Sequence, residues 1–312
     1  MSGSPAPSRS GSGHRAVAVG GGHGLARVLR ALPRVVDHVT AVVTVADDGG
    51  SSGRLRRDLD VLPPGDLRMA LTAMAADREL AELVAYRFVR GELAGHSLGN
   101  LILVALHDLC DDDVVAALDR LAAALQVPGR VLPCTLEPVS LHAVTSTGEV
   151  SGQAAIAATP NLERVWLEPD RPTTHPDVVA AIEQADLVVL GPGSLYTSLL
   201  PNLLVPAVGR ALTETSAPVA LIANLREQPG ETEGMTLHEH LDVLAAHAPG
   251  LEIGWLIAHQ GRSPSGAGVP LTVDDALAGR VGEVLCSDLL DGHDGHDPHA
   301  LAAVLGQVLA RR

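Results

Sequence analysis

The stretch from Val42 to Arg54, VVTVADDGGSSGR, constrains the fold of this chain more than any other. Its first residues are apolar or β-branched and too few for a helix, so they predict a buried strand over Val42–Val45. The residues that follow the strand carry chemistry: Asp47, Asp48, Gly49, Gly50, Ser51, Ser52 and Arg54. Ligands of open α/β sheets bind at the carboxyl ends of strands, so we expect this segment to line a binding crevice.

The composition of this segment suits an anionic ligand. Its glycines allow positive φ angles, which turn backbone N–H groups toward a ligand. The serines add hydroxyl donors, and Arg54 adds a cation with a planar donor fork. The alternative interpretation is a glycine–serine turn whose aspartate caps the next helix.

A second glycine segment follows a short strand over Ala16–Val19. It contains Gly20, Gly21, Gly22, His23 and Gly24, and a helix is predicted from about Leu25 to Leu32. A strand, a glycine turn and a helix place a phosphate at the helix N-terminus, where free N–H groups and the helix dipole favour an anion. The third glycine of a strict dinucleotide motif is replaced by Leu25. We expect the ends of these two strands to converge on one crevice.

Two further segments add candidate side chains. The turn PPGDLR makes Asp66 the expected N-cap of a helix over Leu67–Ala76, with Arg68 in its first turn. A cation there opposes the helix dipole unless an anion binds nearby; the alternative is a surface arginine. A second helix is predicted over Arg78–Gly91. His96 and Asn100 then begin an apolar helix that ends near Cys110, although a lone histidine is more often structural.

A third loop of glycine and hydroxyl residues follows the predicted strand Leu187–Leu190. Its candidate ligand-binding residues are Gly191, Gly193, Ser194, Tyr196, Thr197, Ser198 and Asn202. The strand predicted over Pro218–Ala223 ends at a further candidate, Asn224. Each of these segments is expected at the carboxyl end of a strand.

The alternation of strands and helices predicts an α/β fold with a three-layer, doubly wound, mostly parallel sheet. Residues 131–170 depart from it, because their alternating pattern breaks at Ser146–Gly148 and indicates a small antiparallel hairpin excursion. Residues 1–14 are rich in Ser, Gly and Pro and are predicted to be a disordered tail. Residues 15–312 are predicted to form a single domain.

Composition excludes several classes of function. All 22 basic residues are arginine, so a Walker-type lysine, a Schiff base and a lysine general base are absent. The net charge of −15 argues against non-specific nucleic-acid binding. The three scattered cysteines suit a reducing cytoplasm. No signal peptide or membrane span is recognisable, so we expect a cytoplasmic protein.

A C-terminal cluster resembles a set of metal ligands. It consists of Asp291, His293, Asp294, His296, Asp297 and His299. Nothing in the sequence fixes the geometry of these side chains, and Asp297–Pro298 is explained as the N-cap and first residue of a helix. We therefore expect no metal site in this cluster.

Six colinear motifs from about residue 16 onward resemble the bacterial gluconeogenesis-factor family. They are VAVGGGHGL, VTVADDGGSSGRLR, PPGDLR, HSLGNLIL, GPGSLYTSLLPNLL and QPGETEGMT. His23 stands where that family commonly has Thr, and Met69 where Asn is usual. The resemblance to the 2-phospho-L-lactate transferase of the same superfamily is more distant, because that enzyme's GPSNP-type loop is missing here.

The resemblance implies a cytoplasmic protein that binds a UDP-sugar such as UDP-N-acetylglucosamine. It also implies a role in cell-wall growth that depends on the carbon source, and in cell shape. We expect a non-catalytic sensor that needs no cofactor to bind its ligand, with an unidentified protein partner and a homo-oligomeric state. The main alternative is a transferase in which Asp47 or Asp48 positions Mg²⁺. A dehydrogenase is disfavoured by the missing third glycine.

Overall fold

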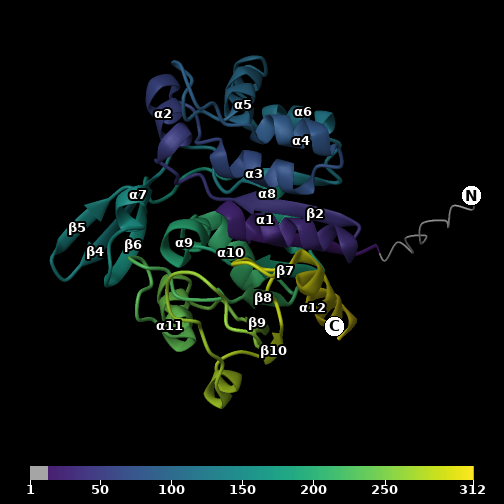
Figure 1. Cartoon of the computed structure of the whole chain (residues 1–312), viewed down its shortest axis with the longest axis vertical. Helices are drawn as coiled ribbons and strands as arrows, with labels where there is room; N and C mark the ends of the chain where they lie inside the picture. Colours follow the sequence, from purple (N-terminus) through teal and green to yellow (C-terminus); the bar gives the residue numbers. More distant parts are fainter. Residues whose placement is uncertain (1–12, 312) are drawn as a thin grey trace, which may run out of the picture.

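A seven-stranded parallel sheet forms the centre of the molecule in the computed structural model, which describes residues 13–311 (Figure 1). From one edge to the other the strands are β10 (Glu283–Ser287), β9 (Trp255–His259), β8 (Val219–Ile222), β7 (Leu187–Leu190), β1 (Arg15–Gly20), β2 (His38–Val43) and β3 (Gly129–Pro133). The parallel sheet predicted from the sequence is confirmed. Residues 1–12 of the predicted tail lie outside the described residues. Within the described chain, the Gly13 amide donates to Asp37 at 2.7 Å.

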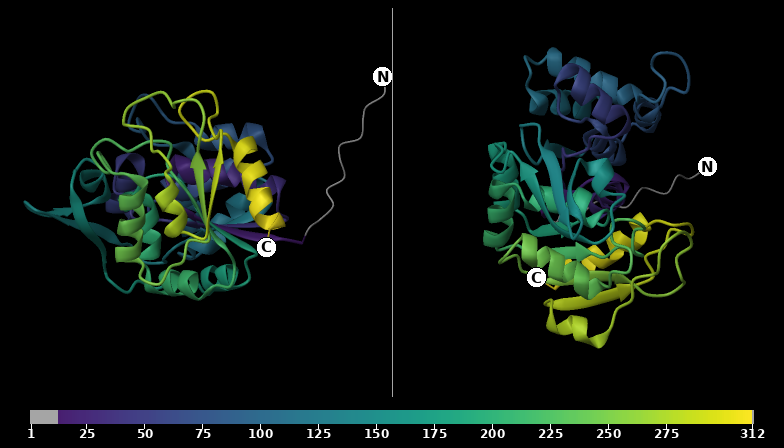
Figure 2. Two further views of the ribbon diagram at one scale, coloured as in Figure 1. Left: turned by 90° about the horizontal axis from the view of Figure 1, so that it is seen from below. Right: turned by 90° about the vertical axis from the view of Figure 1, so that its left-hand side faces the viewer.

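The central strands are buried on both faces because helices cover both sides of the sheet (Figure 2). Every residue of β7 and β8 is buried, and so are all but the first residue of β1. Such strands are continuous apolar runs rather than alternating ones, which is why their short patterns could be recognised in the sequence. The covering helices are α1 (Gly22–Ala31), α3 (Gly65–Met74), α8 (Pro176–Glu183), α10 (Pro206–Glu214), α11 (Leu237–His247) and α12 (Pro298–Ala310).

Helices inserted between β2 and β3 form a lobe at one end of the molecule (Figure 1). This helical lobe consists of α2 (Gly50–Leu59), α3, α4 (Arg78–Ala85), α5 (Leu98–Asp108) and α6 (Val114–Ala124). Asp113 is the N-cap of α6 and accepts hydrogen bonds from the amides of Val115 and Ala116. Helix α3 packs on α1 and thereby joins the lobe to the main sheet.

The predicted antiparallel excursion is also confirmed. Strands β4 (Ser140–Thr145), β5 (Gly148–Ser151) and β6 (Leu162–Glu168) form a separate three-stranded sheet in the order β5-β4-β6. A short helix, α7 (Gln153–Ile156), links β5 to β6. In Figure 1 this small sheet stands to the left of the central sheet, below α2.

Several element boundaries differ from the predictions. The helix predicted over Arg78–Gly91 ends at Ala85, and a hydrogen-bonded hairpin replaces its last turns. Strand β2 begins at His38 and ends at Val43, so Thr44 and Val45 belong to the following loop. Strands β3 and β6 and helix α10 were not predicted from the sequence. No helix in residues 13–311 is long and apolar enough to cross a membrane.

Candidate ligand-binding site

The site lies where the order of the sheet changes direction. From β1 the order continues through β2 and β3 to one edge of the sheet. On the other side of β1 it continues through β7, β8 and β9 to β10 at the opposite edge. In open α/β sheets the crevice at such a switch point is the usual ligand site. The loops after β1 and β7 meet there, since a Cβ atom on Gly24 would lie 1.9 Å from the carbonyl oxygen of Pro192. Glycine is therefore required at this position by close packing.

The N-terminus of α1 faces a carboxylate rather than open solvent. The Asp66 carboxyl accepts a hydrogen bond from the Gly22 amide and would lie 2.5 Å from a Cβ atom on Gly21. Burial and the nearby Asp47 carboxylate raise the pKa of Asp66 to about 7, while the Gly22 bond and Arg68 oppose that shift. The predicted N-cap role of Asp66 on α3 is wrong, because Pro64 occupies that position and Asp66 lies in the first turn.

Arg68 is a buried cation without an acidic partner. Its side chain is only 7% exposed, and its Nε donates to Asn100 Oδ1 at 3.0 Å. Within residues 13–311 its terminal nitrogens form no hydrogen bond, and no carboxylate lies within salt-bridge distance. Burial lowers the pKa of the guanidinium, and Arg87 adds to that effect while Asp66 opposes it. An arginine nevertheless stays charged at neutral pH.

Asn100, Ser51 and His96 hold Arg68 in place through one chain of hydrogen bonds. Asn100 is 1% exposed, and its Nδ2 donates to Ser51 Oγ at 3.0 Å. Ser51 Oγ lies 3.1 Å from His96 Nδ1. Burial lowers the pKa of His96, and Arg54 adds to that shift. Each of these residues was predicted from the sequence as a separate candidate, and in the structure hydrogen bonds connect them.

The two aspartates after β2 point in different directions. Asp47 Oδ1 accepts from the Gly49 amide at 3.0 Å, and its other oxygen would lie 3.3 Å from a Cβ atom on Gly65. Asp47 therefore faces the start of α3. Asp48 accepts from the Ala154 amide at 3.0 Å at the start of α7. It connects the β2 loop to the small sheet.

The expected glycine–serine loop is the first turn of α2. Among its glycines only Gly50 has a positive φ, of 49°. Gly53 is instead required by packing, since a Cβ atom there would lie 1.8 Å from the Asp48 carbonyl. Ser52 Oγ accepts from the Gly65 amide at 3.1 Å, and Arg54 donates to the Ala94 carbonyl at 2.9 Å. These two side chains support the site rather than face it.

A carboxylate from the segment after β8, Glu231, contacts the loop after β7. Glu231 is not among the candidates predicted from the sequence. Glu231 is 3% exposed and accepts from the amides of Tyr196 and Thr197 at 2.7 and 2.9 Å. These amides begin a π-helical turn, η2 (Leu195–Leu199), so the carboxylate occupies the place of a bound anion. Burial raises the pKa of Glu231, and hydrogen bonds from Ser194 and the η2 amides oppose the shift.

Most remaining candidates after β7 and β8 are engaged within the protein. Asn224 Oδ1 accepts from the Gly193 amide at 2.7 Å, and its Nδ2 donates to the Gly193 carbonyl at 2.8 Å. Asn202 Nδ2 donates to the carbonyls of Gly20 and Ser198, whereas its buried Oδ1 has no partner among the described residues. Tyr196 is buried, and its hydroxyl donates to the Leu162 carbonyl at 3.2 Å.

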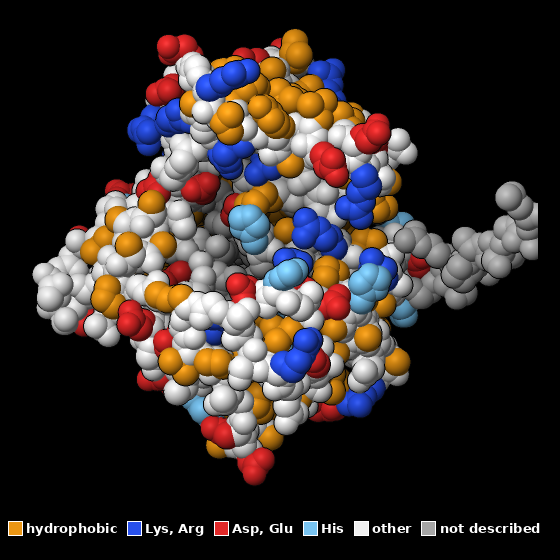
Figure 3. All heavy atoms as spheres, in the orientation of Figure 1, with side chains coloured by type: hydrophobic (Ala, Val, Ile, Leu, Met, Phe, Trp, Pro, Cys, Tyr) orange, Lys and Arg blue, Asp and Glu red, His pale blue; other side chains and the backbone are white. Residues whose placement is uncertain are grey.

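A cavity of about 570 Å³ adjoins the other side of α1. Its walls include His23, Gly193, Asn224, Arg226 and His293. One terminal nitrogen of Arg226, Nη2, is buried without a hydrogen bond to the described residues. A cavity of this size suits a small-molecule ligand. Figure 3 shows that the molecular surface is hollowed between the helical lobe and the sheet, with basic, acidic and histidine side chains at the rim.

Residues 16–276 match the family model described as 2-phospho-L-lactate transferase CofD. The chain belongs to the CofD family. A Mycobacterium tuberculosis protein, provisionally named a gluconeogenesis factor, is 48% identical over 310 residues, which are 95% of this chain and 90% of that protein. A Listeria monocytogenes protein named gluconeogenesis factor is 39% identical, and the match covers 95% of both chains.

Solved CofD-like structures confirm the fold. A Bacillus halodurans protein of the UPF0052 family has a TM-score of 0.86 at 34% identity. The match covers 95% of this chain and 98% of that chain. The resemblance inferred from the six motifs is therefore confirmed at the level of family and fold.

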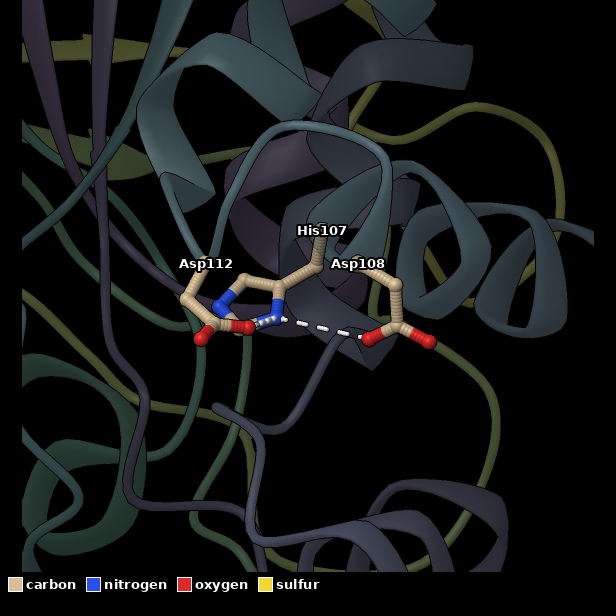
Figure 4. Close-up of side chains that lie close together, drawn as sticks. All are labelled: His107, Asp108 and Asp112. Atoms are coloured by element: carbon tan, nitrogen blue, oxygen red, sulfur yellow. Dashed lines mark ion pairs between the residues drawn. The ribbon is translucent and has the colours of Figure 1, made fainter.

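The C-terminal His/Asp cluster does not converge on a metal position. Asp297 accepts from the His299 amide and caps α12, as predicted, while Asp291 pairs with Arg27 at 2.9 Å. His296 donates to the Ala223 carbonyl and is buried. The group in residues 13–311 with ligand atoms close enough for a metal is instead His107, Asp108 and Asp112 (Figure 4). Both of its aspartates are largely exposed, and we assign no metal to it.

Proposed function

We propose that this protein is a regulatory member of the CofD family that binds a UDP-sugar, with UDP-N-acetylglucosamine as the first candidate. The observation that carries the proposal is the buried Arg68 guanidinium, which has no carboxylate partner. The terminal nitrogens of Arg68 are donors that no described residue accepts, so an anion in the crevice could complete the guanidinium through charge-assisted hydrogen bonds.

The two halves of a nucleotide sugar have separate places in this proposal. The diphosphate would lie between Arg68 and the start of α1, near Gly21 and Gly22. The nucleoside would enter the cavity beside His23 and Arg226. The names of the relatives support a role in gluconeogenesis. The proposed role in carbon-source-dependent cell-wall growth and cell shape rests on the motif resemblance alone.

Calorimetry with UDP-N-acetylglucosamine and with NAD tests the ligand class. We expect saturable binding of the UDP-sugar, and weaker binding of NAD because the third glycine of the dinucleotide motif is missing. A micromolar dissociation constant would correspond to about −8 kcal/mol, which several charge-assisted hydrogen bonds can supply. NAD binding of equal strength would contradict the proposal.

The family match favours a second candidate, a Mg²⁺-dependent transferase acting on a nucleotide diphosphate-linked substrate. Asp47 and Asp66 offer the carboxylate oxygens that Mg²⁺ prefers, and the Asp47 carboxylate raises the pKa of Asp66. These two residues would hold the ion, which would offset charge on the diphosphate. Incubation with UDP-sugars, with and without Mg²⁺, separates the candidates: an unchanged ligand indicates a sensor, and turnover indicates an enzyme.

A further inference from the structure

Two arginines lie beside His96 on the lobe side of the crevice. Arg54 Nη2 donates to the Ala94 carbonyl at 2.9 Å, and Arg87 Nη1 donates to the Gly95 carbonyl at 2.6 Å. The two accepting carbonyls are adjacent in the sequence and directly precede His96. Neither guanidinium forms a salt bridge to any described residue. Each one therefore retains N–H donors and a charge that no carboxylate of the described chain contacts.

A hydrogen-bonded hairpin fixes both guanidinium groups. In residues 86–97 the Phe88 amide donates to the His96 carbonyl at 2.9 Å, and the Gly95 amide donates to the Phe88 carbonyl at 2.7 Å. Gly95 has a φ of 83°, and a Cβ atom there would lie 2.9 Å from Arg54 Nη2. Glycine at this position thus allows the Arg54 side chain to approach the backbone. Because the donors are held in place before a ligand arrives, little conformational entropy is lost on binding.

The positive charges of this group act on one another. Burial lowers the pKa of His96, and Arg54 and Arg87 add to that shift while Asp58 opposes it. Burial also lowers the pKa of Arg68, and Arg87 adds to that shift as well. Like charges held together repel, and a bound anion would relieve the repulsion. Basic side chains are visible on the lobe at the edge of the hollow (Figure 3), although the 312-residue chain has a net charge of −15.

The group adjoins the position proposed for the diphosphate. The hydrogen-bond chain described above connects Arg68 to His96. The cavity proposed for the nucleoside adjoins the other side of α1 instead. The two arginines therefore lie near the end of the ligand that carries the sugar.

We propose that Arg54, Arg87 and His96 bind a second anionic group of the ligand, so that the site prefers a nucleotide sugar whose sugar carries a carboxylate. UDP-glucuronate has this chemistry. The preference rests on the proposed function and adds a choice among UDP-sugars. A carboxylate can accept charge-assisted hydrogen bonds from both guanidinium groups, whereas the hydroxyls of a neutral sugar cannot form ion pairs. UDP-N-acetylglucosamine would bind through its UDP group, without an ion pair to these arginines.

Calorimetry with UDP-glucuronate and UDP-glucose tests the preference, because a carboxylate in the first replaces a hydroxymethyl group in the second. We expect the wild-type chain to bind UDP-glucuronate at least about ten-fold more tightly, as one charge-assisted hydrogen bond would provide. Arg87→Gln should remove most of this difference and change the affinity for UDP-glucose little. The matched control is Arg90→Gln, since Arg90 is exposed in the same hairpin and the substitution removes the same charge. Circular dichroism should show that both variants are folded.

Equal affinities of the wild-type chain for UDP-glucuronate and UDP-glucose would overturn the proposed preference and leave the proposed function intact. Equal losses of UDP-glucuronate binding in Arg87→Gln and Arg90→Gln would also overturn it, because the preference would then reflect net charge alone. If the wild-type chain bound neither of these ligands nor UDP-N-acetylglucosamine, the proposed function itself would fail, and the preference with it.

Discussion

At the scale of single residues, the site is defined by opposite charges in the first turn of α3. Asp66 faces the start of α1, and two residues later Arg68 is buried against Asn100. The sequence drew attention to Arg68 because a cation at a helix start opposes the dipole. The structure strengthens that argument, since the guanidinium is also desolvated. Both side chains are therefore expected to respond to ligand binding.

Replacing Arg68 should lower ligand affinity without unfolding the protein. Each charge-assisted bond to a phosphate contributes roughly 1.5–3 kcal/mol, so Arg68→Ala should weaken UDP-sugar binding about 10- to 150-fold per bond. Arg68→Lys should recover only part, because a point charge replaces a bidentate fork. Calorimetry and the apo melting temperature are the measurements. Unchanged affinity with a lowered melting temperature would show that Arg68 is structural.

Asp66 should make the stability of the apo protein fall as pH rises. Its pKa of about 7 lies above the usual value for an aspartate, so the folded state binds the proton more tightly than the unfolded state. Its contribution is fully present near pH 4 and is lost as the pH rises toward 7. Asp66→Asn should therefore stabilise the apo protein at pH 8 relative to wild type, by roughly 1–3 kcal/mol after screening. Thermal unfolding of both proteins at pH 5 and pH 8 measures this difference, and an equal difference at both pH values would contradict it.

At the scale of elements, carboxylates of the protein occupy the starts of helical segments around the crevice. Asp66 accepts a hydrogen bond from an amide at the start of α1, Glu231 from an amide of η2, and Asp48 from an amide of α7. Such contacts satisfy the free amides of a helix start, so a glycine or hydroxyl loop at a strand end need not bind a ligand. This is why the loop after β7 is packed internally, although its composition resembles that of the loop after β1.

The two aspartates after β2 should consequently behave differently. Asp47→Ala should weaken UDP-sugar binding while the melting temperature changes little, because Asp47 faces the start of α3, where Asp66 and Arg68 lie. Asp48→Ala should chiefly lower stability, by about 0.5–2 kcal/mol, because it removes a helix-cap contact to α7. Calorimetry and thermal unfolding of both variants measure the contrast. If Asp48→Ala alone reduced binding, our assignment of the two roles would be wrong.

At the scale of the whole molecule, the C-terminal segment closes the fold over the ends of the strands. His296 donates to the Ala223 carbonyl after β8, and Asp297 begins α12, which packs on α1. Burial lowers the pKa of His296 to about 4, and Asp291 acts in the opposite direction. The ring is therefore neutral in the folded protein at neutral pH.

Acid should destabilise the whole fold through His296. Its stabilising contribution is present above the usual histidine pKa and is lost as the pH falls toward 4, because the unfolded state then binds the proton more tightly. The loss should approach roughly 3 kcal/mol. His296→Gln should flatten the stability profile between pH 7 and pH 4, as followed by denaturant unfolding at several pH values. An unchanged profile would assign the acid sensitivity to other groups.

The sequence by itself determined the class of fold and the positions of most central strands. Parallel strands buried on both faces are continuous apolar runs, and the segments Leu187–Leu190 and Pro218–Ala223 were recognisable for that reason. It also determined the separate candidates Arg68, His96 and Asn100. Their chemistry is local, and each stands at or near the start of a helix.

Only the tertiary structure decided which candidates form a site. Ser51 and Asn100 are 49 positions apart, and the hydrogen bond that joins them depends on where the fold places the starts of α2 and α5. The partner of the η2 amides, Glu231, lies 35 positions beyond Tyr196. The sequence of one segment indicates which polar groups need hydrogen-bond partners. It does not indicate which residue, distant in the sequence, is the partner. That choice depends on packing and burial, which the folded chain alone establishes.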